Sequence, residues 1–155
     1  MNINLNLPQE KVEAVALFIG AVLIASTISQ SAYFFIQNNF PPSSVHIPIW
    51  SFAWSWLIAI YMVTQVHNNL LRVAILSWVI SKVALWSLSG SWSMAALVIH
   101  NGFYFLAGVL MVSVGVRKNN RRSCFVAFLL MAVLALIQYH ALQSWAKTLE
   151  TITRH

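Results

Sequence analysis

A short basic segment, residues 117–122, separates two long apolar runs in this sequence of 155 residues. It reads Arg-Lys-Asn-Asn-Arg-Arg and holds four of the nine Lys and Arg residues of the chain. Apolar runs of this length are typical of membrane-spanning helices, and the basic loops between such helices stay on the cytoplasmic side. The segment therefore indicates both the fold class, an all-α polytopic transmembrane helix bundle, and the orientation of its helices.

The composition supports a membrane protein and argues against nucleic-acid binding. The chain is 59% hydrophobic and 8% charged, whereas soluble domains have about 25% charged residues. The net charge of +6 comes from basic residues clustered at helix ends rather than along a surface interleaved with aromatic residues, so we expect no nucleic-acid partner. The single cysteine, Cys124, excludes an internal disulfide. The polar and acidic N-terminal segment predicts a retained first helix rather than a signal peptide.

Turn-forming segments divide the apolar sequence into five predicted spans within a single domain, 1–155. The breaks are the Pro41-Pro42 region, the turn at 67–69, the turn at 89–91 and the basic segment. The predicted spans cover about 12–36, 47–66, 70–88, 92–116 and 124–145. A four-span alternative treats the second and third runs as a re-entrant hairpin or an interfacial pair.

Two signals predict the same orientation in a bacterial-type inner membrane, with the N-terminus inside and the C-terminus outside. This arrangement places six basic residues inside and only Lys147 and Arg154 outside; the six are Lys11, Arg72, Arg117, Lys118, Arg121 and Arg122. Five tryptophans fall near the predicted outer ends of their helices, where indole rings lie at the headgroup level: Trp50, Trp54, Trp86, Trp92 and Trp145.

Small residues recur at intervals of four along the first span. Ala16 and Gly20 form one such pair, and Ala21, Ala25 and Ser29 form a second series. Small residues let two membrane helices approach closely. The pattern predicts a helix-packing seam on this helix, although small residues are also simply common in such segments.

Polar residues occur at a similar predicted depth, in the outer half of the spans. They are Gln30, Lys82, His100, Asn101, Gln138 and His140. Polar groups in hydrocarbon are costly unless they are paired, and they usually face the bundle interior. We therefore expect one shared intramembrane polar cluster.

Lys82 has two interpretations, because the spans contain no carboxylate except Glu13 at the start of the first. Its ammonium could bind a lipid phosphate, an anionic ligand or another protein, shielded by the rings of Trp78 and Trp86 one turn away on either side. Alternatively, Lys82 extends to the outer headgroups, with the two tryptophans as interfacial anchors. The shortage of acidic residues argues against a proton-driven antiporter.

His100 and His140 offer one cofactor hypothesis. Two histidines at matched depth on neighbouring helices could be the axial ligands of a haem, or could line a quinone site. The simpler interpretation is that each histidine hydrogen-bonds to a neighbour and packs. We expect no cofactor, no metal site and no enzymatic activity, since no catalytic signature is visible.

The sequence thus favours a small non-enzymatic membrane protein that acts as an oligomeric anchor or sensor subunit. It would present a basic cytoplasmic face to anionic lipids or to a cytosolic partner protein; this face comprises Arg72, Arg117, Lys118, Arg121 and Arg122. Proteins of this size also serve in defence, exclusion or immunity systems. Two alternatives are a pore-forming or transport oligomer for an anion or neutral solute, and a haem- or quinone-binding subunit of a redox complex.

Overall fold

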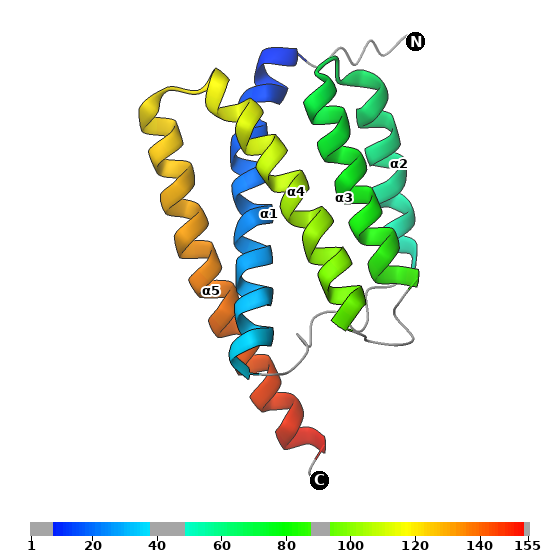
Figure 1. Cartoon of the computed structure of the whole chain (residues 1–155), viewed down its shortest axis with the longest axis vertical. Coiled ribbons are helices and arrows are strands. Elements are labelled where there is room, and N and C mark those ends of the chain that lie inside the picture. Colours follow the sequence, from blue (N-terminus) through cyan, green and yellow to red (C-terminus); the bar gives the residue numbers. More distant parts are fainter. Residues whose placement is uncertain (1–7, 38–48, 88–93, 154–155) are drawn as a thin grey trace.

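The computed structural model describes residues 8–37, 49–87 and 94–153, and all regular secondary structure in these ranges is helical (Figure 1). The helices are α1 (Gln9–Gln37), α2 (Ile49–Gln65), α3 (Asn69–Ser87), α4 (Met94–Lys118) and α5 (Arg121–Thr153). The predicted all-α class is confirmed. The breaks predicted at 41–42 and at 89–91 lie outside the described residues.

The predicted spans match helices, and the largest difference is in α5. This helix begins at Arg121 and continues to Thr153, eight residues beyond the predicted span end. The tail is helical because residues such as Ala146 and Lys147 have high helix propensity. The Thr148 and Thr151 hydroxyls donate to carbonyls one turn earlier in this helix, at 3.0 and 2.9 Å.

The basic segment forms a tighter connection than the predicted loop. Arg117 and Lys118 belong to α4, Arg121 and Arg122 belong to α5, and only residues 119–120 form the turn. Asn120 caps α5, because its Oδ1 accepts the N–H of Ser123 at 2.9 Å.

Three segments of the described chain are long and apolar enough to cross a membrane: Gln9–Gln37, Leu97–Lys118 and Arg121–Ile152. In α2, the segment Trp56–Gln65 is apolar but shorter. These segments indicate a membrane protein. The arrangement in five spans stays a prediction.

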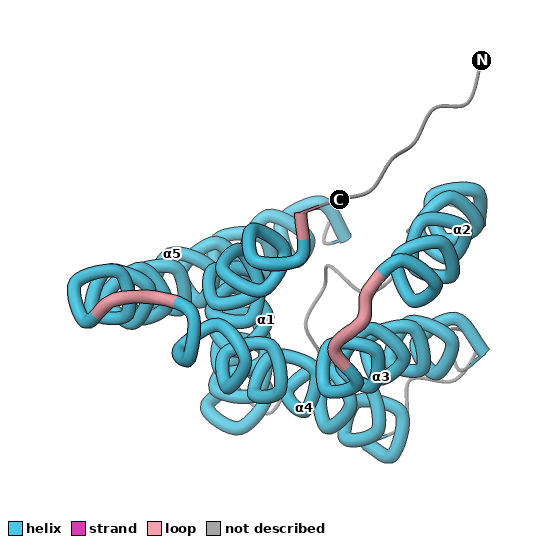
Figure 2. Tube along the Cα trace, turned by 90° about the horizontal axis from the view of Figure 1, so that it is seen from above, coloured by secondary structure: helices cyan, strands magenta, loops and turns pink. Residues whose placement is uncertain are grey.

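The helices form an open arc rather than a closed ring. Their principal contacts run in the order α5–α1–α4–α3–α2, and the contact between α1 and α4 is the most extensive. Figure 2 shows this order from above, with α5 and α2 at the two ends of the arc. The turns at 66–68 and 119–120 lie at the same end of the bundle as the start of α1 (Figure 1).

The contact between α1 and α4 depends on glycines that bring the two backbones together. A Cβ added at Gly20 would lie 2.6 Å from the carbonyl oxygen of Gly108 and 2.8 Å from the backbone nitrogen of Val112. A Cβ added at Gly115 would meet the backbone of Leu17. No larger residue fits at Gly20 or Gly115 unless the helices move apart.

Helix α1 is central to both apolar cores. One core joins α1 to α3 and α4 and includes Leu23, Leu71 and Met111. The other joins α1 to α5 and includes Leu17, Ala21 and Ala127. The five small residues of the predicted seam, Ala16, Gly20, Ala21, Ala25 and Ser29, are all buried. By contrast, α5 exposes many large apolar side chains, as expected of a surface that faces lipid.

We expect Gly115→Ala to lower the free energy of unfolding by about 1–3 kcal/mol, the usual cost of overpacking. The added methyl group would meet backbone atoms of Leu17, which a change of rotamer cannot remove. Gly102→Ala is a matched control on the same helix, because a Cβ there has nothing within 4 Å. Thermal unfolding in mild detergent should show a lower midpoint for Gly115→Ala only; equal midpoints for both variants would contradict this account of the contact.

Candidate functional site

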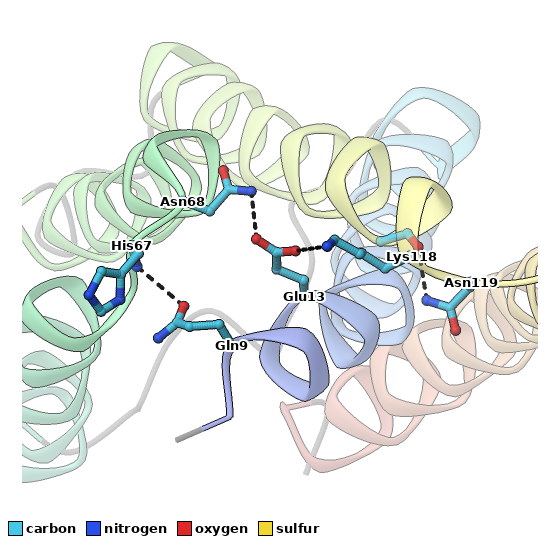
Figure 3. Close-up of polar contacts among 7 residues, drawn as sticks. Gln9, Glu13, His67, Asn68, Lys118 and Asn119 are labelled. Carbon is cyan, nitrogen blue, oxygen red and sulfur yellow. Dashed lines mark hydrogen bonds and ion pairs between the residues drawn. The ribbon is translucent and has the colours of Figure 1, made fainter. Parts of the chain in front are cut away.

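Polar side chains from three segments meet at the end of the bundle where α1 begins (Figure 3). Glu13 lies at their centre. One of its carboxylate oxygens lies 3.2 Å from the Lys118 ammonium, and the other accepts a hydrogen bond from the Asn68 side chain at 3.0 Å. The carboxylate therefore joins α1 to the α2–α3 turn and to the end of α4.

The side-chain amides of Gln9 and Asn119 complete this network by forming hydrogen bonds to backbone N–H and C=O groups at the helix ends. The Gln9 amide donates to the carbonyl of Gln65 at 2.8 Å and accepts from the N–H of His67 at 3.3 Å. The Asn119 amide donates to the carbonyls of Ala14 and Gly115, at 3.0 and 2.8 Å. We call Gln9, Glu13, Asn68, Lys118 and Asn119 the end network. It fixes both turns against α1.

The five residues of the predicted basic face have different roles at this end. Lys118 is the ion-pair partner of Glu13, and the Nε of Arg72 donates to the carbonyl of Val66 at 2.6 Å. Arg117, Arg121 and Arg122 are exposed. Within the described part of the chain, these three arginines have no hydrogen bond or ion pair. They flank the turn at 119–120 and leave three guanidinium groups available for a partner.

The predicted intramembrane polar residues are divided among three helix contacts. In the contact between α3 and α4, His100 is 3% exposed, and its Nδ1 lies 2.9 Å from the carbonyl oxygen of Ser81. Because a carbonyl can only accept, this Nδ1 carries the hydrogen. In the same contact, the Lys82 ammonium lies 4.8 Å from the centre of the Tyr104 ring.

Two of the remaining polar residues, Asn101 and Gln138, lie in the two contacts of α1. Asn101 on α4 donates to the Ser31 hydroxyl at 3.3 Å, and Ser29 donates to the Oε1 of Gln138 on α5 at 3.1 Å. Gln30 donates to Ser26 of its own helix at 3.3 Å. His140 is exposed on α5.

One copy of the chain therefore does not gather these residues into the single expected cluster. His100 faces α3, whereas His140 lies exposed on α5, so the chain does not bring the two histidines together. The reason is rotational: hydropathy gives the depth of a residue along a helix but not the direction in which it faces. Any haem or quinone site that used both histidines would need another arrangement or a second copy.

A groove of about 380 Å³ lies between α1, α2, α3 and α4. Its walls are almost entirely apolar and include Ile19, Leu23, Met62, Ile75, Trp78 and Tyr104. This groove, Tyr104 and the α4 glycines were not predicted from the sequence. The seven-residue spacing of Gly108 and Gly115 is the signal that could have identified the second face of the seam.

The ion pair in the end network can be tested with a double-mutant cycle of Glu13→Gln and Lys118→Gln. The carboxylate is 13% exposed and the ammonium 45% exposed, so solvent screens the pair and we expect a coupling energy of about 0.5 kcal/mol. This coupling should decrease in 1 M salt, where the Debye length is about 3 Å. The measurement is the free energy of unfolding of the four variants at low and high salt. Strictly additive effects would show that the two charges do not interact.

Two features of the described residues have chemical potential for binding. Within these ranges, no group of three or more His, Cys, Asp or Glu residues lies together as metal ligands would. The two features are the exposed arginines beside the end network, and the groove with Lys82 and Tyr104 near it. Comparison with family models, curated proteins and solved structures finds no match for this chain.

Proposed function

We propose that this chain is a non-enzymatic integral membrane protein that anchors or senses a cytosolic partner through the arginines at its α4–α5 turn. The observation that carries the proposal is the exposure of Arg117, Arg121 and Arg122 beside a turn that the end network holds in place. The partner would present an acidic surface or segment, to which guanidinium groups donate paired hydrogen bonds.

Helix electrostatics support a binding role for two of these arginines. Cations stabilise the C-terminal end of a helix and are unfavourable at its N-terminal end, where the unpaired N–H groups carry partial positive charge. Arg117 lies in the last turn of α4, but Arg121 and Arg122 open α5. Arg121 and Arg122 therefore do not contribute to the stability of α5. An external anion would offset this cost.

The end network supports affinity as well as position. Arg121 and Arg122 follow a turn in which the Asn119 side chain bonds to α1 and Asn120 caps α5. Binding then does not require the backbone of the turn to become ordered, which would otherwise reduce affinity.

In the proposed topology all five helices cross a bacterial-type inner membrane, with the turn at 119–120 on the cytoplasmic side. At 1.5 Å per residue, α2 and α3 have lengths of roughly 26 and 28 Å, close to the bilayer core of about 30 Å. The cytoplasmic side is the one that favours exposed arginines.

An oligomer is part of the proposal because α5 has few neighbours in one copy. Its principal contact is with α1, and His140 lies on its exposed surface. A histidine exposed to lipid is costly, whereas one that faces another helix can hydrogen-bond across the interface. A second copy packed on α5 would remove this cost.

The test is to purify the chain from its own host in mild detergent and to identify any cytosolic protein that remains bound. We expect Arg121→Gln with Arg122→Gln to reduce the retained protein by at least about tenfold, because two desolvated charge pairs are lost. Lys147→Gln, an exposed change at the other end of α5, should retain it.

Topology needs its own control, because the arginines also direct insertion. A reporter fused after residue 155 should give the same signal in the double variant as in the unchanged chain. Unchanged retention of the protein in the double variant would reject the proposal, as would the absence of any bound protein from the unchanged chain. Binding that depends on the arginines but occurs only on phosphatidylglycerol vesicles would assign the face to lipid instead.

A further inference from the structure

We infer that the groove between α1, α2, α3 and α4 binds a single-chain amphiphile with a carboxylate head, of the long-chain fatty acid class, whose acid group pairs with Lys82. The apolar walls would hold the chain, and the ammonium near Tyr104 would hold the head. This inference does not depend on the basic face, which lies at the end of the bundle.

Lys82 continues the groove-facing side of α3. The groove is lined by Leu71, Ile75 and Trp78 of this helix. Residues at intervals of three and four share one helix face, and Lys82 is the next residue in this series. The ammonium therefore lies at the end of an apolar wall.

The side chain of Lys82 is directed along the bundle towards the groove. His100 of α4 contacts Ser81, the residue beside Lys82, whereas the ammonium lies over Tyr104, one α4 turn nearer to the end network. Tyr104 also lines the groove. Of the two interpretations of Lys82 in the sequence, the structure therefore favours an internal ligand over extension to the outer headgroups.

No acidic side chain in the described part of the chain pairs with this ammonium. The chain's only acidic side chains are Glu10, Glu13 and Glu150. The first two lie in the opening turns of α1, at the opposite end of the bundle, and the third lies near the end of α5, whose principal contact is with α1. Among the described residues, Lys82 has only the ring of Tyr104 as a partner. A carboxylate from outside the chain would complete the ion pair.

The groove opens towards the lipid side of the arc. Ile19 of α1 and Ile58 of α2 line it and are 48% and 61% exposed. The contact between α1 and α2 is not one of the principal helix contacts. A molecule dissolved in the bilayer can therefore reach the groove between these two helices. This access favours an amphiphile over a water-soluble anion.

Volume distinguishes a single chain from larger occupants. The groove measures about 380 Å³, near the lower limit of known ligand pockets. Two turns of a partner helix, about 11 Å long and 10 Å wide, would need roughly twice this volume. One charged group beside one narrow apolar groove matches one head and one chain.

The experiment uses the full chain in mild detergent and 9,10-dibromostearate, a carboxylate whose bromine atoms quench tryptophan fluorescence. We expect saturable quenching by the acid. The protein should bind the acid with an affinity at least about tenfold higher than its affinity for the methyl ester of the same fatty acid, since only the acid forms a charge pair. Lys82→Met should remove this difference by lowering the affinity for the acid but not for the ester, and Lys82→Arg should preserve the difference. Trp78→Phe should abolish most of the quenching, because Trp78 lines the groove.

Lys147→Met is the matched charge control, and its affinity for the acid should be unchanged. Thermal unfolding without ligand verifies that each variant is folded. Equal affinities of acid and ester for the unchanged chain would overturn the inference, because the groove would then be an ordinary lipid-filled surface. An unchanged affinity in Lys82→Met would also overturn it. Stronger, Lys82-dependent quenching by a brominated phosphatidylglycerol would assign the site to a phospholipid and reject the fatty acid.

Discussion

The close backbone contact between α1 and α4 is the interaction on which the rest of the bundle depends. Lipid tails are as apolar as the side chains that face them, so burial alone does not hold membrane helices together, and close packing takes its place. Gly20, Gly108 and Gly115 allow this packing by removing the side chains that would separate the backbones. Helix α5 then packs on α1 and α3 packs on α4, so the positions of both follow from this one contact.

The open arc explains why the chemistry of the chain is divided between two places. Because α2 packs on α3 and not principally on α1, the face between α1 and α2 stays open and becomes a groove. At the end of the bundle the same arc is closed by polar bonds instead, with Glu13 joined to Asn68 and Lys118. One region offers an apolar surface beside a cation, and the other offers exposed arginines beside a turn held by hydrogen bonds.

The sequence predicts those features that depend on position along a helix. The helices were predictable because apolar runs and turn residues alternate clearly, and the small residues of α1 are buried as a seam would be. Features that depend on the direction in which a residue faces were not predictable. His100, Asn101 and Gln138 lie at similar depth but belong to three different helix contacts. The ring under the Lys82 ammonium belongs to Tyr104 on the neighbouring helix, whereas the sequence suggested rings of its own helix.

The geometry of Lys82 limits which ligands can satisfy it. An ammonium has three N–H donors, and an aromatic ring shields the charge on one side without accepting a conventional hydrogen bond from each donor. The side away from Tyr104 therefore needs an oxygen acceptor that can enter hydrocarbon. Water would need further polar partners, and the groove walls provide almost none. A carboxylate attached to an apolar chain supplies two acceptor oxygens and an opposite charge, and its chain fills the apolar groove, which is why the amphiphile suits this site better than water or a small hydrated anion.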